Sequence, residues 1–161
     1  MDHAEMHHDM QAGDPEGREL TRLAVSATAH CLTGCAIGEV LGMVIGTALG
    51  WGELQTVALA VGLAFFFGYL LALRPVLRAG IGVRAALPLV LAADTLSITT
   101  MEVVDNAIML GIPGAMEAGL TSPLFWGSLA TALAIAFVVT VPVNRWLIAR
   151  GKGHAVVHSM H

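Results

Sequence analysis

Four long apolar stretches restrict what this 161-residue chain can fold into. They cover about residues 23–50, 54–73, 85–110 and 124–149. An α-helix needs about 20 mostly apolar residues to cross the hydrocarbon core of a bilayer. Charged residues make up only 12% of the chain, against about 25% in soluble domains. The sequence therefore predicts an all-α integral membrane protein with four transmembrane helices.

The basic residues predict how these helices are oriented. All eight Lys and Arg residues lie before the first stretch, between the second and third, or at and beyond the end of the fourth. Because cytoplasmic loops carry an excess of Lys and Arg, we expect both termini in the cytoplasm and the protein in a bacterial inner membrane. The predicted layout is a tail over residues 1–19, a transmembrane domain over 20–150 and a second tail over 151–161. No basic face is available for a nucleic acid.

Glycine recurs at every fourth position of the first apolar stretch. This spacing places small residues on one helix face, where they allow another helix to approach closely in a membrane. We predict a packing face and a homo-oligomer, for which this face is a candidate contact. The face consists of Gly34, Gly38, Gly42, Gly46 and Gly50. Interhelical hydrogen bonds are expected from Ser97, Thr99, Thr100 and Asn106 in the third stretch.

A second pattern with the same spacing lies on that first helix. Cys31, Cys35, Glu39 and Met43 also recur every fourth residue, and His30 adjoins them. Thiol, thioether and imidazole groups are ligands of soft and borderline transition metals. We predict a metal site at His30, Cys31 and Cys35 that Glu39 and Met43 continue. Because buried cysteine also serves as a small packing residue, that alternative stays open.

The third stretch is unusually polar for a membrane helix. At 100° per residue, its acids and several methionines fall within about 100° of arc. An acid at the bilayer centre costs roughly 2.5–3.5 kcal/mol on insertion scales, and no basic residue lies within the membrane to neutralise these. If the first and third helices face each other, Cys31 lies at the depth of Asp94. Glu39 then lies level with Met101 and Glu102, which together form a cation path. The stripe consists of the predicted metal ligands Met101, Glu102, Asp105 and Met109 and of Asp94, which is predicted to lie on the path.

Both tails are rich in potential metal ligands. His-rich tracts indicate metal binding by composition. Histidine in third position also allows a free amino terminus to form a square-planar Cu(II) or Ni(II) site. The alternative is that both tails are simply solvated. The candidate ligands are His3, Met6, His7, His8 and Met10 in the first tail and His154, His158 and His161 in the second.

Three sequence segments resemble a known family. They are His-Cys-Leu-Thr-Gly-Cys-Ala-Ile-Gly-Glu at residues 30–39, Met-Glu-Val-Val-Asp-Asn at 101–106 and Asn-Arg-Trp at 144–146. They resemble a bacterial family of small four-helix membrane proteins, domain of unknown function 4396. That resemblance implies the four-helix architecture and carries no established activity. Separately, the tail beginning Met-Asp-His is similar to the tails of copper uptake transporters, which differ from this chain in having three helices and outward-facing tails.

Three functions are compatible with these features. The favoured function is that of a membrane protein that binds a transition metal, preferably copper, and transports or relays it. Zinc, iron and manganese are alternatives, because they also suit carboxylate and imidazole ligands. A membrane metal or thiol oxidoreductase using Cys31 and Cys35 ranks lower, because their spacing is not Cys-x-x-Cys. The third is an assembly subunit that delivers metal. A transporter is favoured over an enzyme. The expected partners are the lipid bilayer, further copies of the chain, and a metallochaperone or metalloprotein client.

Overall fold

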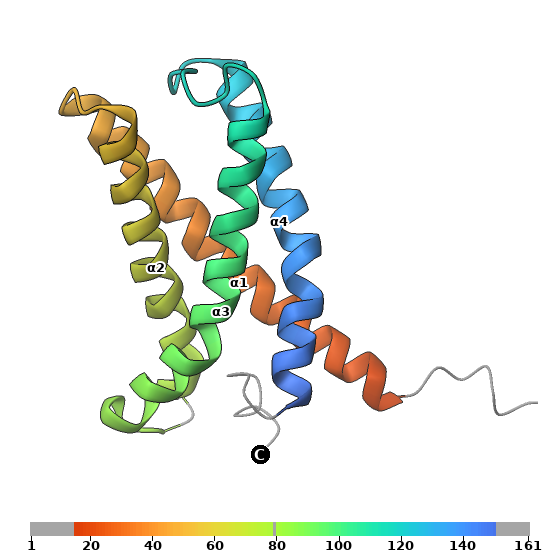
Figure 1. The fold of residues 1–161 in the computed structure, drawn as a ribbon. Helices are drawn as coiled ribbons and strands as arrows, with labels where there is room; N and C mark the ends of the chain where they lie inside the picture. Colours follow the sequence, from red (N-terminus) through yellow and green to blue (C-terminus); the bar gives the residue numbers. More distant parts are fainter. Residues whose placement is uncertain (1–14, 79, 151–161) are drawn as a thin grey trace, which may run out of the picture.

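The computed structural model describes residues 15–78 and 80–150. The chain forms the helices α1 (Pro15–Ala48), α2 (Glu53–Arg78), α3 (Val83–Gly111) and α4 (Pro123–Ala149) (Figure 1). Strands are absent from the residues described, and the all-α prediction is confirmed. The metal ligands predicted in the two tails lie outside the described residues.

Two helix boundaries differ from the predicted ones. α1 begins at Pro15, earlier than residue 23, and therefore overlaps the predicted first tail. Proline suits the first turn of a helix, where its missing N–H would have no partner. α2 continues through Pro75 to Arg78, because neighbouring helices and local adjustments satisfy the backbone groups that proline frees in membrane helices.

Among the described helices, three are long and apolar enough to cross a membrane, namely α1, α2 and α4. α3 is also long, with 29 residues, but Asp94, Glu102 and Asp105 interrupt its apolar sequence. The structure thus supports a multi-pass membrane protein with three candidate spans.

The helix connections alternate between two ends of the bundle (Figure 1). Residues 49–52, between α1 and α2, and residues 112–122, between α3 and α4, lie at one end, which we call the loop end. The start of α1, the α2–α3 connection and the end of α4 lie at the opposite tail end. All seven arginines belong to this tail end, and each is exposed.

The glycine face of α1 packs against α2. A methyl group added at Gly38 would lie 2.1 Å from the backbone nitrogen of Ala64, and one at Gly42 would lie 2.4 Å from Cα of Ala60. Gly34 and Gly46 are also crowded by α2, Gly34 by the backbone of Gly68 and Gly46 by the side chain of Thr56. α2 presents its own buried residues at the same four-residue spacing: Thr56, Ala60, Ala64, Gly68, Ala72 and Val76. The face is therefore occupied within the chain and is not free to contact a second copy, contrary to one of our expectations.

Gly50 differs from the other four glycines. Its φ is +65°, and no atom lies within 4 Å of a Cβ built there. Its N–H donates to the carbonyl oxygen of Thr47 (3.2 Å), and the N–H of Trp51 donates to that of Gly46 (2.9 Å). This is the Schellman arrangement that ends many helices. Gly50 therefore ends α1 instead of packing against a helix as predicted.

A buried hydrogen-bond network joins α1, α3 and α4. Asn144 Nδ2 donates to Thr28 Oγ1 at 2.8 Å, and Asn144 Oδ1 accepts from the hydroxyl of Ser97. Ser97 thus makes the expected interhelical bond. Thr100 and Asn106 instead donate to carbonyl oxygens of their own helix, each at 2.8 Å.

Candidate cation site

Three sulfur-containing side chains lie in one buried cluster between the helices. Cys31 and Cys35 come from α1 and Met101 comes from α3; Cys35 and Met101 are fully buried. Both cysteines are free. Residues of α2, α3 and α4 complete the cluster: Ala64, Ile98 and Ala136. All four helices therefore enclose a small group of soft metal ligands.

Three carboxylic side chains lie next to this cluster, on its loop-end side. Glu39 follows Cys35 by one turn on α1, and Glu102 and Asp105 belong to α3. Their exposed fractions are 8%, 5% and 3%. The carboxyl group of Glu102 lies beside the thiol of Cys35, and that of Glu39 lies beside Asp105.

These carboxyl groups are poorly satisfied by the protein. Both oxygens of Glu39, both of Glu102 and Oδ1 of Asp105 are buried without a hydrogen-bond partner among the described residues. Buried polar groups are normally hydrogen-bonded, and burying a charge unpaired is costly. A cavity of about 40 Å³ borders all three acids, enough for a few water molecules. The acids must therefore be protonated, hydrated or neutralised by a cation.

The contact between α1 and α3 is displaced from the predicted register. Glu39 was expected level with Met101 and Glu102, but it lies beside Asp105, and Cys35 lies beside Glu102. α1 crosses the bundle diagonally (Figure 1), so residues at equal distances from the helix ends are not at equal heights. Asp94 is also buried, on the same helix nearer the tail end.

His30 does not join the thiols. Its ring is exposed, and its Nδ1 lies 2.8 Å from the carbonyl oxygen of Ser26, whereas both cysteines are buried. In the part of the chain that the structure describes, no group of three or more His, Cys, Asp or Glu residues is arranged to hold a metal ion. The third soft ligand beside the two thiols is the thioether of Met101.

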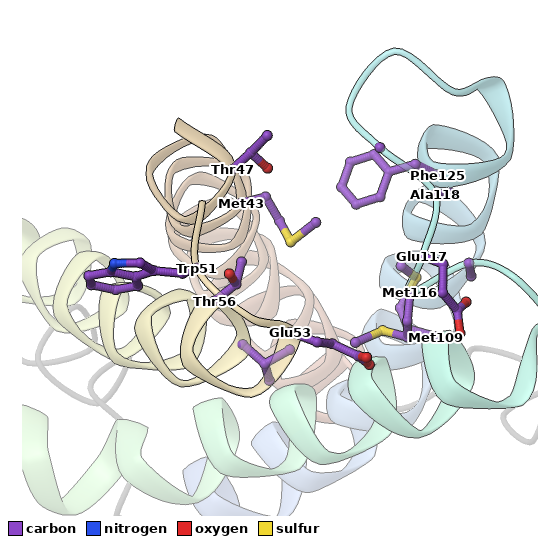
Figure 2. Close-up of a pocket in the computed structure, with 13 residues that line it drawn as sticks. Met43, Thr47, Trp51, Glu53, Thr56, Met109, Met116, Glu117, Ala118 and Phe125 are labelled. Atoms are coloured by element: carbon purple, nitrogen blue, oxygen red, sulfur yellow. The ribbon is translucent and has the colours of Figure 1, made fainter. Parts of the chain in front are cut away.

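A larger cavity, of about 330 Å³, lies at the loop end (Figure 2). Met109, a predicted metal ligand, and Met43, predicted to lie on the cation path, line it together with Met116. Glu53 and Glu117 also line it. The sequence did not predict a role for Met116, Glu53 or Glu117, because these residues lie in or beside helix connections, where helical periodicity gives no information. The adjacent Met-Glu pair at residues 116–117 was the available signal.

Residues 22–153 match the model of a protein family described as a domain of unknown function (DUF4396). The chain belongs to this family. The DUF4396 match includes the sulfur cluster and the three acids, and it confirms the resemblance seen in the sequence. No curated protein and no solved structure matches the chain. The DUF4396 family therefore supplies no activity, and the function must be argued from the site.

Proposed function

We propose that this protein binds a soft transition-metal cation, preferably copper(I), and transports it across the membrane. The observation that carries this proposal is the shared burial of Cys31, Cys35 and Met101 between the four helices. Thiolate and thioether ligands favour Cu(I), zinc and iron–sulfur clusters over harder metals. The bound cation would also offset the negative charge of the thiolates.

The ligand types favour copper over the other metals. Structural zinc sites hold four Cys, His or carboxylate ligands in a tetrahedron, and the thioether of Met101 is not one of these. His30, which would suit zinc or iron, is turned to a backbone carbonyl outside the cluster. Two thiols and one thioether therefore support Cu(I) best.

The acids support movement of the cation as well as binding. Glu39, Glu102 and Asp105 lie on the loop-end side of the sulfur cluster, and their buried oxygens have no hydrogen-bond partner in the described residues. A cation leaving the thiols would meet these carboxylates next. They can also receive the protons that thiols release when they bind a metal.

A four-span topology fits this path. The acids of α3 are buried, whereas Leu96, Val103 and Leu110 of the same helix are exposed. Ionisable residues of membrane helices characteristically face the bundle interior, so α3 suits a fourth span. The exposed arginines at the tail end favour a cytoplasmic location for that end in a bacterial inner membrane.

The other two functions make different demands. Thiol oxidoreductase chemistry needs cysteines that a partner can reach, and here both are buried. A subunit that delivers metal to another protein needs binding without flux. Binding and flux must therefore be measured separately.

The test compares wild type with Cys31→Ser/Cys35→Ser in proteoliposomes that contain a Cu(I)-responsive dye. Serine preserves the side-chain size and can bond to its own helix backbone, so the fold should persist. The variant should bind less copper per chain than wild type, measured by elemental mass spectrometry, because the thiol site is lost, and it should lose copper influx. Thr33→Ser, at an exposed site on the same helix, is the matched control. Unchanged copper content and influx in the double variant would refute the proposal, and binding without influx in wild type would favour the delivery subunit.

A further inference from the structure

We propose that the loop-end cavity is a second soft-cation site, formed by Met43, Met109 and Met116. There a monovalent ion such as Cu(I) or Ag(I) enters or leaves the bundle. This inference rests on the proposed function for the transport itself and for its cargo. The binding itself can be tested independently.

Three separate segments bring these methionines to one cavity. Met43 comes from α1, Met109 from α3 and Met116 from the α3–α4 loop. Figure 2 shows Met43 reaching into the cavity from one side and the other two lying on the opposite side. Methionine commonly fills gaps in apolar cores, and all three methionines do pack on one apolar cluster with Phe125 and Leu129, Met109 within it and the other two against it. Here, however, the three thioethers border a space of about 330 Å³ instead of filling it.

The chemistry of the cavity wall favours a soft monovalent cation. Thioethers are neutral, soft ligands that suit Cu(I). Glu53 and Glu117 lie exposed in the same wall, where their charge raises the local concentration of cations. Hard divalent ions such as Ca²⁺ require six or more oxygen ligands, and two exposed carboxylates cannot provide them.

The cavity also leads toward the buried acids. The smaller cavity, which borders Glu39, Glu102 and Asp105, is lined in addition by Met43, Met109 and Met116. Each of the three acids is more than nine-tenths buried, with oxygens that lack a partner among the residues described. A cation held by the methionines therefore has these carboxylates as its next available ligands.

The test uses the full chain in detergent micelles, with ¹³C-labelled methionine methyl groups observed by NMR. Silver nitrate is titrated in a chloride-free buffer. The methyl signals of Met43, Met109 and Met116 should shift together along a single binding curve. Thioethers bind without releasing a proton, whereas thiols and histidines must lose one. Plotted against the free silver concentration, which allows for silver held by the thiols and histidines, this curve should therefore not change between about pH 5.5 and 7.5, where histidine titrates.

Variants connect the three signals to one site. Met116→Leu conserves side-chain volume and should preserve the fold. This variant should lower the Ag(I) affinity reported by the Met43 and Met109 signals about tenfold or more. Mutations around bound metals commonly lower metal affinity by that much. Ile135→Leu, a change of equal size at an exposed position of α4 outside both cavities, is the control and should leave the curve unchanged. Unaltered binding at Met43 and Met109 in Met116→Leu would overturn the proposal.

The two proposals can fail separately. In Cys31→Ser/Cys35→Ser the loop-end methyl shifts should persist, since these methionines do not depend on the thiols. Normal loop-end shifts with no influx in wild type would refute transport and leave the methionine site intact. Independent or absent shifts at the three methionines would identify them as packing residues, whatever the influx.

Discussion

Replacing Gly38 by alanine should separate α1 from α2. The added methyl carbon would begin 2.1 Å from the backbone nitrogen of Ala64 and 2.4 Å from its Cα. Real Cβ atoms essentially never approach other heavy atoms within 3.0 Å. Because the obstruction is backbone, no rotamer change can relieve it, and the helices must move apart by nearly 1 Å at this point.

The cost can be bracketed from two opposing effects. Overpacking a well-packed interface typically costs about 1–3 kcal/mol, and here several neighbouring contacts along the interface loosen as well. Alanine regains up to about 1 kcal/mol through its better helix propensity. The net loss in the free energy of unfolding should be about 2 kcal/mol. Gly62→Ala, on α2 with open space around its Cβ position, should instead gain up to about 1 kcal/mol.

The assay is reversible unfolding in mixed micelles by increasing SDS, followed by tryptophan fluorescence. Gly38→Ala should unfold at lower SDS than wild type, and Gly62→Ala at the same or higher SDS. Both variants make the same chemical change within a helix, so they differ only in what the new methyl group meets. Equal midpoints for the two variants would refute the close packing of α1 on α2.

Two further predictions concern the interior. Asn144→Ala removes both interhelical hydrogen bonds of the network and should lower the free energy of unfolding by about 1–2 kcal/mol. Such bonds average about 0.6 kcal/mol each in a membrane protein, and the cavity left by the missing side chain adds to the loss. Thr131→Ala, which removes an exposed hydrogen bond within α4, is the control in the same SDS assay. If both variants unfold at the same SDS concentration, the network does not stabilise the fold. Glu39→Gln should lower copper influx about tenfold, the effect of roughly 1.4 kcal/mol on a barrier, while copper at the thiols is retained. Glu19→Gln, exposed on the same helix, should transport normally, and normal influx in Glu39→Gln would remove the carboxylates from the path.

Hydropathy predicted where the helices are but not where α1 starts. Apolar runs report the part of a helix that matches the bilayer, and three of the four runs agree with the structure to within a few residues. The first turns of α1, from Pro15, are polar, so they carry no such signal. They are helical because proline and Glu16 suit a helix start.

The partner of the glycine face was present in the sequence but obscured. Ala60, Ala64 and Gly68 repeat at the same four-residue spacing as the glycines of α1. They lie in an almost continuous apolar run, where small residues do not stand out. Matching the two periods would have predicted the α1–α2 contact.

The candidate site was predictable in composition but not in register. The stripes of α1 and α3 predicted that Cys35, Glu39, Glu102 and Asp105 are neighbours if the two helices face each other. Which residue lies beside which depends on how α1 tilts across the bundle, and single-helix periodicity contains no information on tilt. Met116 joins the loop-end cavity through the path of a loop, which periodicity does not describe either.

The order of residues along α1 explains why packing and ligands share one helix. Cys35, Glu39 and Met43 directly follow Gly34, Gly38 and Gly42. Successive residues are rotated by 100° about a helix axis. With the glycines pressed against the α2 backbone, the following side chains must therefore lie about 100° around α1 from that contact. Here that direction leads to α3 and the cavities. A glycine cannot be enlarged without shifting the ligand that follows it, so the close contact with α2 sets the separation between the ligands of α1 and the acids of α3.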